Sequence, residues 1–169
     1  HRVQVFDSHG RFLRKFGSVG NSKRHSNNLY GIAWSDGELF VCNYANHRIR
    51  VFKCSSGRRA REFGSQGIAD GSLMGPIGVS VHGDVVFVLE YYGNRVSVFN
   101  RNGGFIRKWG SQGTGAGQFS HPYGICVSSD GEVFIADHGN HRIQVFDMFG
   151  KFMLSGGTQE MDNSLIRML

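Results

Sequence analysis

An arginine recurs four times along this chain at a nearly constant spacing. In three of these places a polar residue stands five positions before it. The arginines are Arg2, Arg48, Arg95 and Arg142. The polar residues five positions before the last three are Asn43, Glu90 and Asp137. A guanidinium near a carboxylate can form an ion pair that fixes the loop between them, whereas a ring of such groups without acids would bind an anion. Residues that build a fold recur in every unit, so the repetition favours the structural role. Arg48, which follows the neutral Asn43, is the arginine that we expect to contact a partner.

Aromatic rings and cations are interleaved in the stretches between these arginines. The candidates for a binding face are Tyr30, Tyr44, Tyr91, Tyr92, Tyr123 and His138, with Lys23, Arg24 and Arg48 as cations. This mixture suits single-stranded RNA, because bases stack on rings and phosphates meet Lys and Arg. It equally suits a protein partner, since Tyr and Arg are common interface anchors. Packing of Tyr30, Tyr123 and part of the Tyr91–Tyr92 pair between repeats, without any partner, is a third interpretation.

Catalytic and metal-binding patterns do not recur with the arginines. His47 and His141 occupy matching positions, but Asn94 stands at the third, so no repeated three-histidine site is indicated. The glycine-rich stretch 113–117 lacks the Gly-Lys-Ser/Thr ending of a phosphate-binding loop. No Ser-His-Asp or Cys-His set can be argued from the spacing. We therefore expect a non-catalytic chain without metal or cofactor.

The segments that position these residues repeat along the chain. The arginines at 2, 48, 95 and 142 are separated by steps of 46, 47 and 47 residues. A second marker with the same step comprises Phe16-Gly17-Ser18, Phe63-Gly64-Ser65 and Trp109-Gly110-Ser111. A third comprises Tyr30-Gly31-Ile32, Ile77-Gly78-Val79 and Tyr123-Gly124-Ile125. Independent markers that share one period indicate a repeat architecture.

Each unit reads as four short strands joined by turns. In the last unit the strands are expected at 124–127, 132–136, 142–146 and 151–154. The turn Ser129-Asp130-Gly131 separates the first two strands, because Asp-Gly accepts positive φ. The apolar character of 132–136 fits a strand covered on both faces. Four antiparallel strands in about 46 residues are typical of one propeller blade.

The sequence therefore predicts an all-β fold, a β-propeller of four-stranded antiparallel blades with about three and a half blades present. The expected divisions are the outer half of a blade at 1–18, full blades at 29–64, 76–110 and 122–155, and a degenerate or disordered tail at 156–169. A propeller closes with roughly four to eight blades. We therefore expect a fragment of a larger ring, with the remaining blades supplied by further sequence or by another chain, and a truncated N-terminus.

The repeated motifs resemble the NHL repeat over nearly the whole chain. The shared pattern runs Pro-x-Gly-Ile/Val, Asp-Gly-x-Val-Phe/Tyr-Val-Ala-Asp, Asn-x-Arg-Ile/Val-x-Val-Phe, Gly-x-Phe and Phe-Gly-Ser-x-Gly. WD40 repeats fit less well because the chain has no Trp-Asp dipeptide. Kelch repeats fit less well because the chain has no regularly placed Gly-Gly pairs. In NHL propellers the loop between the second and third strands and the link between blades open on one common face. The resemblance would place the candidate aromatic residues there.

The resemblance implies a non-catalytic interaction module or scaffold that binds a protein or single-stranded RNA through one face. NHL propellers often select the targets of tripartite-motif ubiquitin ligases, whose catalytic part is absent from this sequence. A protein is favoured because the net charge of +6 is modest and many cations are expected along outer strand edges. Those edge cations are Arg14, Lys15, Arg58, Arg59, Arg61, Arg107 and Lys108. The alternatives are a metal-dependent lyase or lactonase of the propeller kind and an extracellular structural or sensor domain.

The cysteines give an expectation about the compartment. Their number is three, they form no CxxC pair, and Cys42 and Cys126 lie in apolar strand patterns, so both are expected to be small core residues. Free cysteines favour a reducing compartment, and we expect a cytoplasmic protein. No stretch approaches the roughly 20 apolar residues that cross a bilayer.

Overall fold

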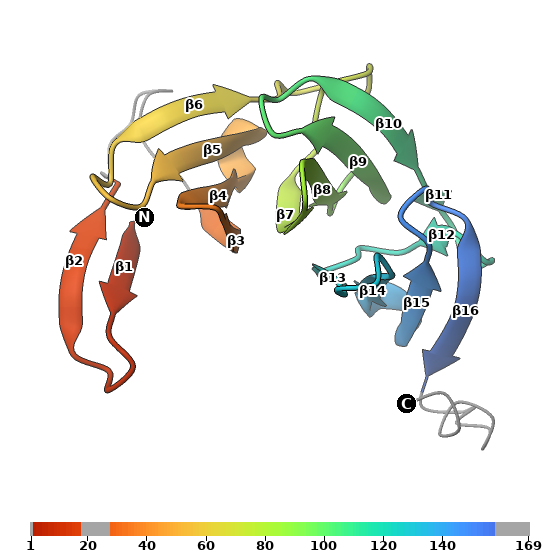
Figure 1. Ribbon diagram of the computed structural model, residues 1–169. Coiled ribbons are helices and arrows are strands. Elements are labelled where there is room, and N and C mark those ends of the chain that lie inside the picture. The colour runs from red at the N-terminus through yellow and green to blue at the C-terminus, as the bar shows by residue number, and fades with distance from the viewer. Residues whose placement is uncertain (1, 18–27, 158–169) are drawn as a thin grey trace.

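The fold is a series of antiparallel β-sheets, as a computed structural model describes it for residues 2–17 and 28–157. Three sheets have four strands each, and one sheet at the beginning of the chain has two. Figure 1 shows that these sheets follow one another along an open arc, with the first strand of each full blade on the inner side. The predicted propeller architecture with about three and a half blades is therefore confirmed for the described residues.

The strands of each sheet follow one another in chain order. The half-blade consists of β1 (Val3–Phe6) and β2 (Phe12–Phe16). The first full blade consists of β3 (Leu29–Ser35), β4 (Glu38–Asn43), β5 (Arg48–Lys53) and β6 (Arg59–Phe63). The second consists of β7 (Pro76–His82), β8 (Val85–Glu90), β9 (Arg95–Asn100) and β10 (Phe105–Trp109). The third consists of β13 (Gly124–Val127), β14 (Val133–Asp137), β15 (Arg142–Phe146) and β16 (Phe152–Gly157).

Short elements complete the chain between these strands. The link before the third full blade contains the parallel pair β11 (Ser111–Gln112) and β12 (Gln118–Phe119). Two 3-10 turns, η1 (Tyr44–Asn46) and η2 (His138–Asn140), join the second strand to the third in the first and third full blades. Among residues 2–17 and 28–157, no helix has the length and apolar character needed to span a membrane.

The hairpin turns explain where the strands end. Ser35 pairs with Glu38, so the turn between β3 and β4 holds only Asp36 and Gly37. Their φ angles are 47° and 76°, the positive values that a two-residue turn of this kind requires. The expected turn at 129–131 also forms, but β14 begins at Val133, one residue later than predicted. The outer strand β16 continues beyond the predicted 154 to Gly157.

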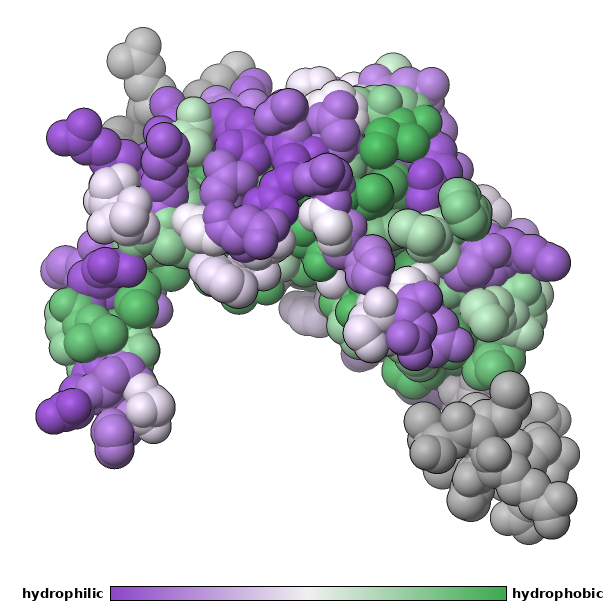
Figure 2. Space-filling model, viewed as in Figure 1, coloured by the Kyte–Doolittle hydropathy of each residue, from purple (hydrophilic) through white to green (hydrophobic). Residues whose placement is uncertain are grey.

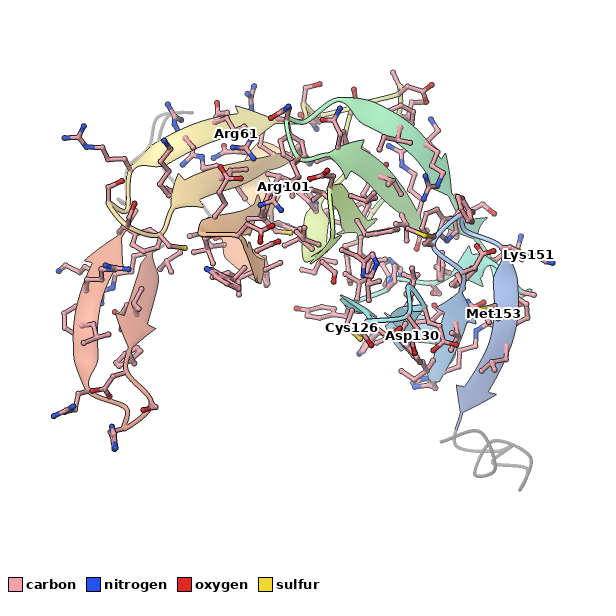
Figure 3. The ribbon with its side chains drawn as sticks, in the orientation of Figure 1. Arg61, Arg101, Cys126, Asp130, Lys151 and Met153 are labelled. Carbon is pink, nitrogen blue, oxygen red and sulfur yellow. The ribbon has the colours of Figure 1, made fainter. Side chains whose placement is uncertain are left out.

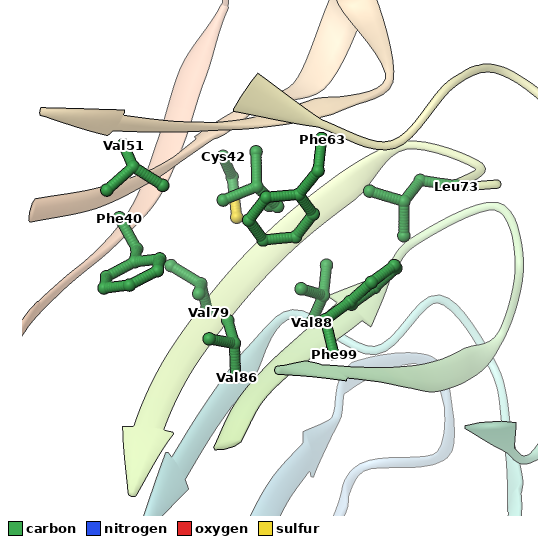
Figure 4. Packing of buried hydrophobic residues seen from close by; sticks show 10 residues of the cluster. Phe40, Cys42, Val51, Phe63, Leu73, Val79, Val86, Val88 and Phe99 are labelled. Atoms are coloured by element: carbon green, nitrogen blue, oxygen red, sulfur yellow. The ribbon is translucent and has the colours of Figure 1, made fainter. Parts of the chain in front are cut away.

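The hydrophobic core lies between neighbouring blades. One cluster joins the first and second full blades and includes Phe40, Val51, Phe63, Val86 and Phe99 (Figure 4). The Phe63 and Phe99 rings, which come from β6 and β9, lie 5.0 Å apart between centroids. Burial of each such side chain contributes about 1.5–3 kcal/mol, so the stability of each blade depends on its neighbours.

The third full blade is less buried than the second, because no sheet of the described residues follows it. In β8 every residue from Val86 to Glu90 is buried, whereas β14 alternates between buried and partly exposed positions. The prediction that 132–136 is covered on both faces is therefore wrong, because no described sheet packs on its outer face. For the same reason the prediction for Cys126 is wrong: it is exposed, on the inner strand of this blade (Figure 3), while Cys42 is fully buried as expected.

Candidate functional site

One loop geometry recurs between the second and third strands of each full blade. The residue immediately before the repeated arginine has a left-handed backbone in all three blades, with φ of 52° at His47, 47° at Asn94 and 54° at His141. Asn and His adopt this conformation more readily than most residues, which accounts for their recurrence at this position. The turn reverses the chain and places the residues before it at the same end of each sheet, beside the start of the first strand.

The aromatic residues from this end of the three sheets form a continuous cluster. It contains all five tyrosines and two histidines. The members of this cluster, which we call the tyrosine face, are Tyr30, Tyr44, Tyr91, Tyr92, Tyr123, His121 and His138. Ring centroids lie 5.1 Å apart for Tyr44 and Tyr30, 5.7 Å for Tyr44 and Tyr92, and 6.0 Å for Tyr91 and Tyr123. The structure thus brings together six aromatic candidates that are scattered over more than one hundred residues of sequence.

The members of the tyrosine face differ in exposure. Tyr30, Tyr92 and Tyr123 are 46%, 56% and 49% exposed. Tyr44 and Tyr91 are half-buried and pack against the core between the second and third full blades. Burial raises the pKa of the Tyr44 hydroxyl, and its hydrogen bond to Tyr92 acts in the same direction. Tyr44 and Tyr91 are therefore held by the core, and the more exposed rings of Tyr30, Tyr92 and Tyr123 pack against them.

Gly75 lets the backbone approach these rings. Its φ is +68°, and a Cβ atom at this position would lie 2.9 Å from the Tyr92 ring and 3.1 Å from the Tyr44 ring. The Gly75 N–H also donates to His47 Nδ1 at 3.0 Å, so that nitrogen must be unprotonated. Burial lowers the pKa of His47, which favours this neutral form. Any larger residue at position 75 would displace the rings.

The repeated arginine of the second full blade is buried in an ion pair. Arg95 Nε lies 2.8 Å from Glu90 Oε1, as the spacing of five residues suggested. The same guanidinium donates to the carbonyl oxygens of Ile68 at 3.0 Å and Ser72 at 3.1 Å, both in the link before this blade. Arg95 therefore fastens the link to the sheet, and its donors point away from solvent.

The third full blade repeats this arrangement with an aspartate. Arg142 Nε lies 2.8 Å from Asp137 Oδ2, and its Nη2 donates to the carbonyl oxygens of Gly115 and Gln118 at 2.7 and 2.9 Å. Gln144 Nε2 donates to the same carboxylate oxygen at 3.0 Å. The carboxylate is thus held by two side-chain donors from β15.

Arg48 and Arg2 occupy the same repeat position in different surroundings. Arg48 Nη1 contacts Glu62 Oε1 at 3.2 Å, across the sheet on β6. It also lines a pocket of about 160 Å³ with Asn46 and His47. Arg2 is exposed and lines a pocket of about 420 Å³ with Tyr30, at the border of the tyrosine face.

Several cations of the outer strands join blades to one another. Arg61 on β6 donates to both carboxylate oxygens of Glu38, at 2.6 and 2.7 Å, and to the carbonyl oxygen of Arg101 at 2.8 Å. Figure 3 shows Arg61 and Arg101 close together where the first two full blades meet. Each guanidinium carbon also lies 5.7 Å from the centroid of the Phe40 ring. At Arg61 the expected edge charge is therefore an inter-blade contact.

His121 is a member of the tyrosine face that the sequence did not reveal. Its ring centroid lies 4.9 Å from that of Tyr91, and its backbone N–H donates to Asn94 Oδ1 at 2.8 Å. It directly precedes Pro122 at a strand entry, the position that Gly75 holds one repeat earlier. The candidates Lys23 and Arg24 lie outside the described residues. In the part of the chain that is described, no group of three or more His, Cys, Asp or Glu side chains is arranged to hold a metal ion.

Comparisons with known proteins identify the repeat and the fold. Residues 119–146 match the family model of the NHL repeat. A comparison with curated proteins gave no match. The structure is similar to virginiamycin B lyase from Staphylococcus aureus, with a TM-score of 0.67, 15% identity, and coverage of 95% of this chain and 50% of that one. It is also similar to a chain of a nidogen/laminin complex, with a TM-score of 0.66, 14% identity, and coverage of 92% and 55%.

A third similar structure is the hydrazine synthase of Kuenenia stuttgartiensis, with a TM-score of 0.63, 19% identity, and coverage of 85% of this chain and 40% of that one. This chain thus spans about half the length of the solved chains that it matches. At these identities the likeness concerns the fold. Together with the four-stranded sheets and the recurring arginines, it establishes that the chain is a β-propeller that carries an NHL repeat at residues 119–146.

Proposed function

We propose that this chain is a non-catalytic interaction module that binds a protein partner through the tyrosine face. The NHL-repeat propeller fold is in general suited to such a role. The observation that carries the proposal is that all five tyrosines of the chain form one cluster, in which Tyr30, Tyr92 and Tyr123 are about half exposed. Clustered aromatic residues on a surface are typical anchors of protein interfaces.

The cluster is held in place before any partner arrives. Tyr44 contacts three other tyrosine rings and is itself half-buried. The backbone of Gly75 lies close to the Tyr92 and Tyr44 rings and restricts the movement of both side chains. Rings that are already fixed lose little conformational entropy on binding, so more of the contact energy contributes to affinity.

The surroundings of the arginines support a protein rather than single-stranded RNA as the partner. An RNA site needs cations that are available to phosphates. Arg95 and Arg142 instead bind carboxylates and the carbonyl oxygens of the links. Arg48 contacts Glu62. Aromatic contact area thus dominates the tyrosine face, and an exposed extended segment of a protein is the partner that suits it.

Within this proposal the chain serves as a recognition module of a longer polypeptide, with catalysis located elsewhere. The resemblance to the propellers of tripartite-motif ubiquitin ligases supports selection of a target protein in the cytoplasm. In such an arrangement the tyrosine face would hold the target while a separate domain modifies it.

Selection from a displayed library of random peptides tests the proposal. The full chain is immobilised, selected peptides are synthesised, and their affinities are measured in solution. We expect saturable binding that excess salt weakens only slightly, because apolar contacts dominate. A mixed-sequence single-stranded RNA is measured in parallel at low salt. Tight RNA binding that falls steeply with salt, with no peptide selected, would contradict the proposal.

A further inference from the structure

A histidine connects the first two full blades beside the tyrosine face. His47 ends the turn between β4 and β5, and its Nδ1 accepts a hydrogen bond from the backbone N–H of Gly75 at 3.0 Å. Gly75 is buried and lies in the link that leads into the second full blade. A ring nitrogen of histidine accepts a hydrogen bond only when it carries no proton. This connection therefore exists only while His47 is neutral.

The second full blade makes the same connection without a titratable group. Asn94 corresponds to His47 in the repeat and has the same left-handed backbone. Its Oδ1 accepts from the backbone N–H of His121 at 2.8 Å, and His121 precedes Pro122 as Gly75 precedes Pro76. Nδ1 of histidine and Oδ1 of asparagine are both bonded to Cγ, so the two acceptors occupy equivalent positions. Of the two bonds, the one at His47 can be broken by a proton.

The link residues Met74 and Gly75 connect His47 to the tyrosines. The carbonyl oxygen of Gly75 accepts from the Tyr91 N–H at 2.9 Å, and that of Met74 accepts from the Tyr92 N–H at 3.2 Å. The Gly75 backbone also lies against the Tyr92 and Tyr44 rings, where there is no room for a Cβ atom. Any movement of Gly75 is therefore expected to change the positions of these rings.

The surroundings of His47 allow its ring to gain a proton. It is half-buried and lines a pocket of about 160 Å³ with Arg48, whose guanidinium stays charged at all relevant pH values. Burial lowers the pKa of His47 from its ordinary value of 6.5, while the charge of Glu90 acts in the opposite direction. Tyr44, whose carbonyl oxygen accepts from the His47 N–H at 3.1 Å, has a raised pKa and stays neutral. A histidine with a lowered folded pKa stabilises the fold above its unfolded pKa, and this stabilisation is lost as pH falls through the folded pKa.

Contacts at the opposite end of the sheets keep the two blades together in this pH range. Glu38 is the first residue of β4, whereas Tyr44 follows its last residue. Arg101 of the second full blade lies 3.5 Å from Glu38, and its carbonyl oxygen accepts from Arg61 Nε at 2.8 Å. Hydrogen bonds from Arg61 hold the pKa of Glu38 below its ordinary value of 4.5, so this carboxylate stays charged above about pH 5. Figure 2 shows hydrophilic surface where the two blades meet, at the place that Arg61 and Arg101 have in Figure 3.

We propose that His47 is a pH-sensitive switch of the tyrosine face. Near neutral pH its ring accepts from Gly75, and the link holds the rings of Tyr44 and Tyr92 in place. On acidification Nδ1 gains a proton and becomes a donor, so the buried N–H of Gly75 loses its acceptor and the link moves away from His47. The rings then lose their fixed arrangement. A bound partner should therefore leave the tyrosine face on acidification, a consequence that rests on the proposed function.

Near-ultraviolet circular dichroism of the full chain without a partner tests the switch. The tyrosine signal reports on this face, because all five tyrosines belong to it. Between about pH 7.5 and about pH 5 we expect a transition in the unchanged chain. His47→Asn should abolish the transition and keep the neutral-pH spectrum, because asparagine accepts at this position as Asn94 does. His47→Ala should show the acid spectrum at every pH, since it has no acceptor for the Gly75 N–H.

Other histidines provide the controls. His141→Asn is the matched control, because His141 holds the same loop position in the third full blade, with φ of 54°, and should leave the transition unchanged. His121 and His138 contact tyrosine rings directly, so a variant with both replaced by Asn tests whether they cause the transition. It should retain the transition at the same pH. The proposal is overturned if the unchanged chain shows no transition, if His47→Asn retains it, or if the double variant lacks it.

A selected peptide without acidic residues or histidine extends the test to binding. Its dissociation constant should rise about fivefold or more from about pH 7.5 to about pH 5 in the unchanged chain, as expected when one hydrogen bond that holds the site is lost. It should change less than about twofold in His47→Asn. Equal affinities of the unchanged chain at both pH values would overturn the regulation. Failure of every peptide to bind near neutral pH would contradict the proposed function alone, because the ring transition decides the switch without a partner.

Discussion

Glu90 and Arg95 form a buried ion pair across the turn between β8 and β9, with 2.8 Å between Oε1 and Nε. The Glu90 side chain is fully buried. Its other oxygen, Oε2, accepts from the Met74 N–H at 2.7 Å, and Ser97 Oγ donates to Oε1 at 2.6 Å. A single carboxylate thus joins the turn, the neighbouring strand and the link that precedes the blade.

Removing this charge is expected to destabilise the protein strongly. Glu90→Gln leaves the Arg95 guanidinium buried without its acid, and a broken buried pair costs about 3–5 kcal/mol in the free energy of unfolding. Urea denaturation followed by circular dichroism measures the loss. The control is Asp7→Asn, which should lose far less stability because Asp7 pairs with the exposed Arg11 in contact with solvent. Equal losses for the two variants would show that the Glu90 pair does not fasten the blade.

Glu38 gives stability a dependence on pH. Hydrogen bonds from Arg61 hold the pKa of this carboxyl below its ordinary value of 4.5, and the charge of Arg61 acts in the same direction. A carboxyl with a lowered folded pKa stabilises the protein at pH values above its unfolded pKa, and that stabilisation is lost as pH falls through the folded pKa. The unfolding free energy should therefore fall on acidification below about 4.5 more steeply in the unchanged chain than in Glu38→Gln. Parallel curves for the two proteins would contradict the stabilising role of the Glu38–Arg61 pair.

Gly75→Ala is expected to disturb the tyrosine face in particular. The added Cβ would meet the Tyr92 and Tyr44 rings, and the positive φ of +68° adds backbone strain. Near-ultraviolet circular dichroism of the tyrosines should change, and the protein should lose about 1–2 kcal/mol of stability. Gly37→Ala is the control, because Gly37 has φ +76° and nothing lies within 4 Å of its Cβ position. If Gly37→Ala altered the tyrosine signal as much as Gly75→Ala, ring contact at position 75 would not be the cause.

The repeat made much of the fold predictable from the sequence. Strand β15 begins at Arg142 and ends at Phe146 as expected, because its alternating pattern recurs with the period of the blades. The spacing of five residues also indicated the ion pairs of Arg95 and Arg142, since both partners lie on adjacent strands joined by a short turn. Local periodicity carries this kind of information directly.

Contacts between blades were much less predictable. His121 joins the tyrosine face by meeting Tyr91 of the preceding blade, and no local pattern marks that pair. Arg61 reaches the carbonyl oxygen of Arg101, 40 residues away. The exposure of Cys126 depends on the lack of a described sheet beyond β13, whereas its own strand pattern is as apolar as that of Cys42. Packing between blades determines the contacts and exposure of these residues. The sequence of one strand does not reveal which residues of the next blade lie opposite it.

The affinity of a selected peptide for alanine variants of the tyrosine face measures the central claim most directly. Tyr92→Ala and Tyr123→Ala remove rings that are 56% and 49% exposed, so folding should be preserved while anchoring contacts are lost. Each should weaken peptide binding by about tenfold or more, as expected for interface anchors. Phe149→Ala, which removes a ring that is 71% exposed but lies outside the tyrosine face, should leave the affinity unchanged. Unchanged affinity in both tyrosine variants, or an equal loss in Phe149→Ala, would contradict the assignment of the tyrosine face as the binding surface.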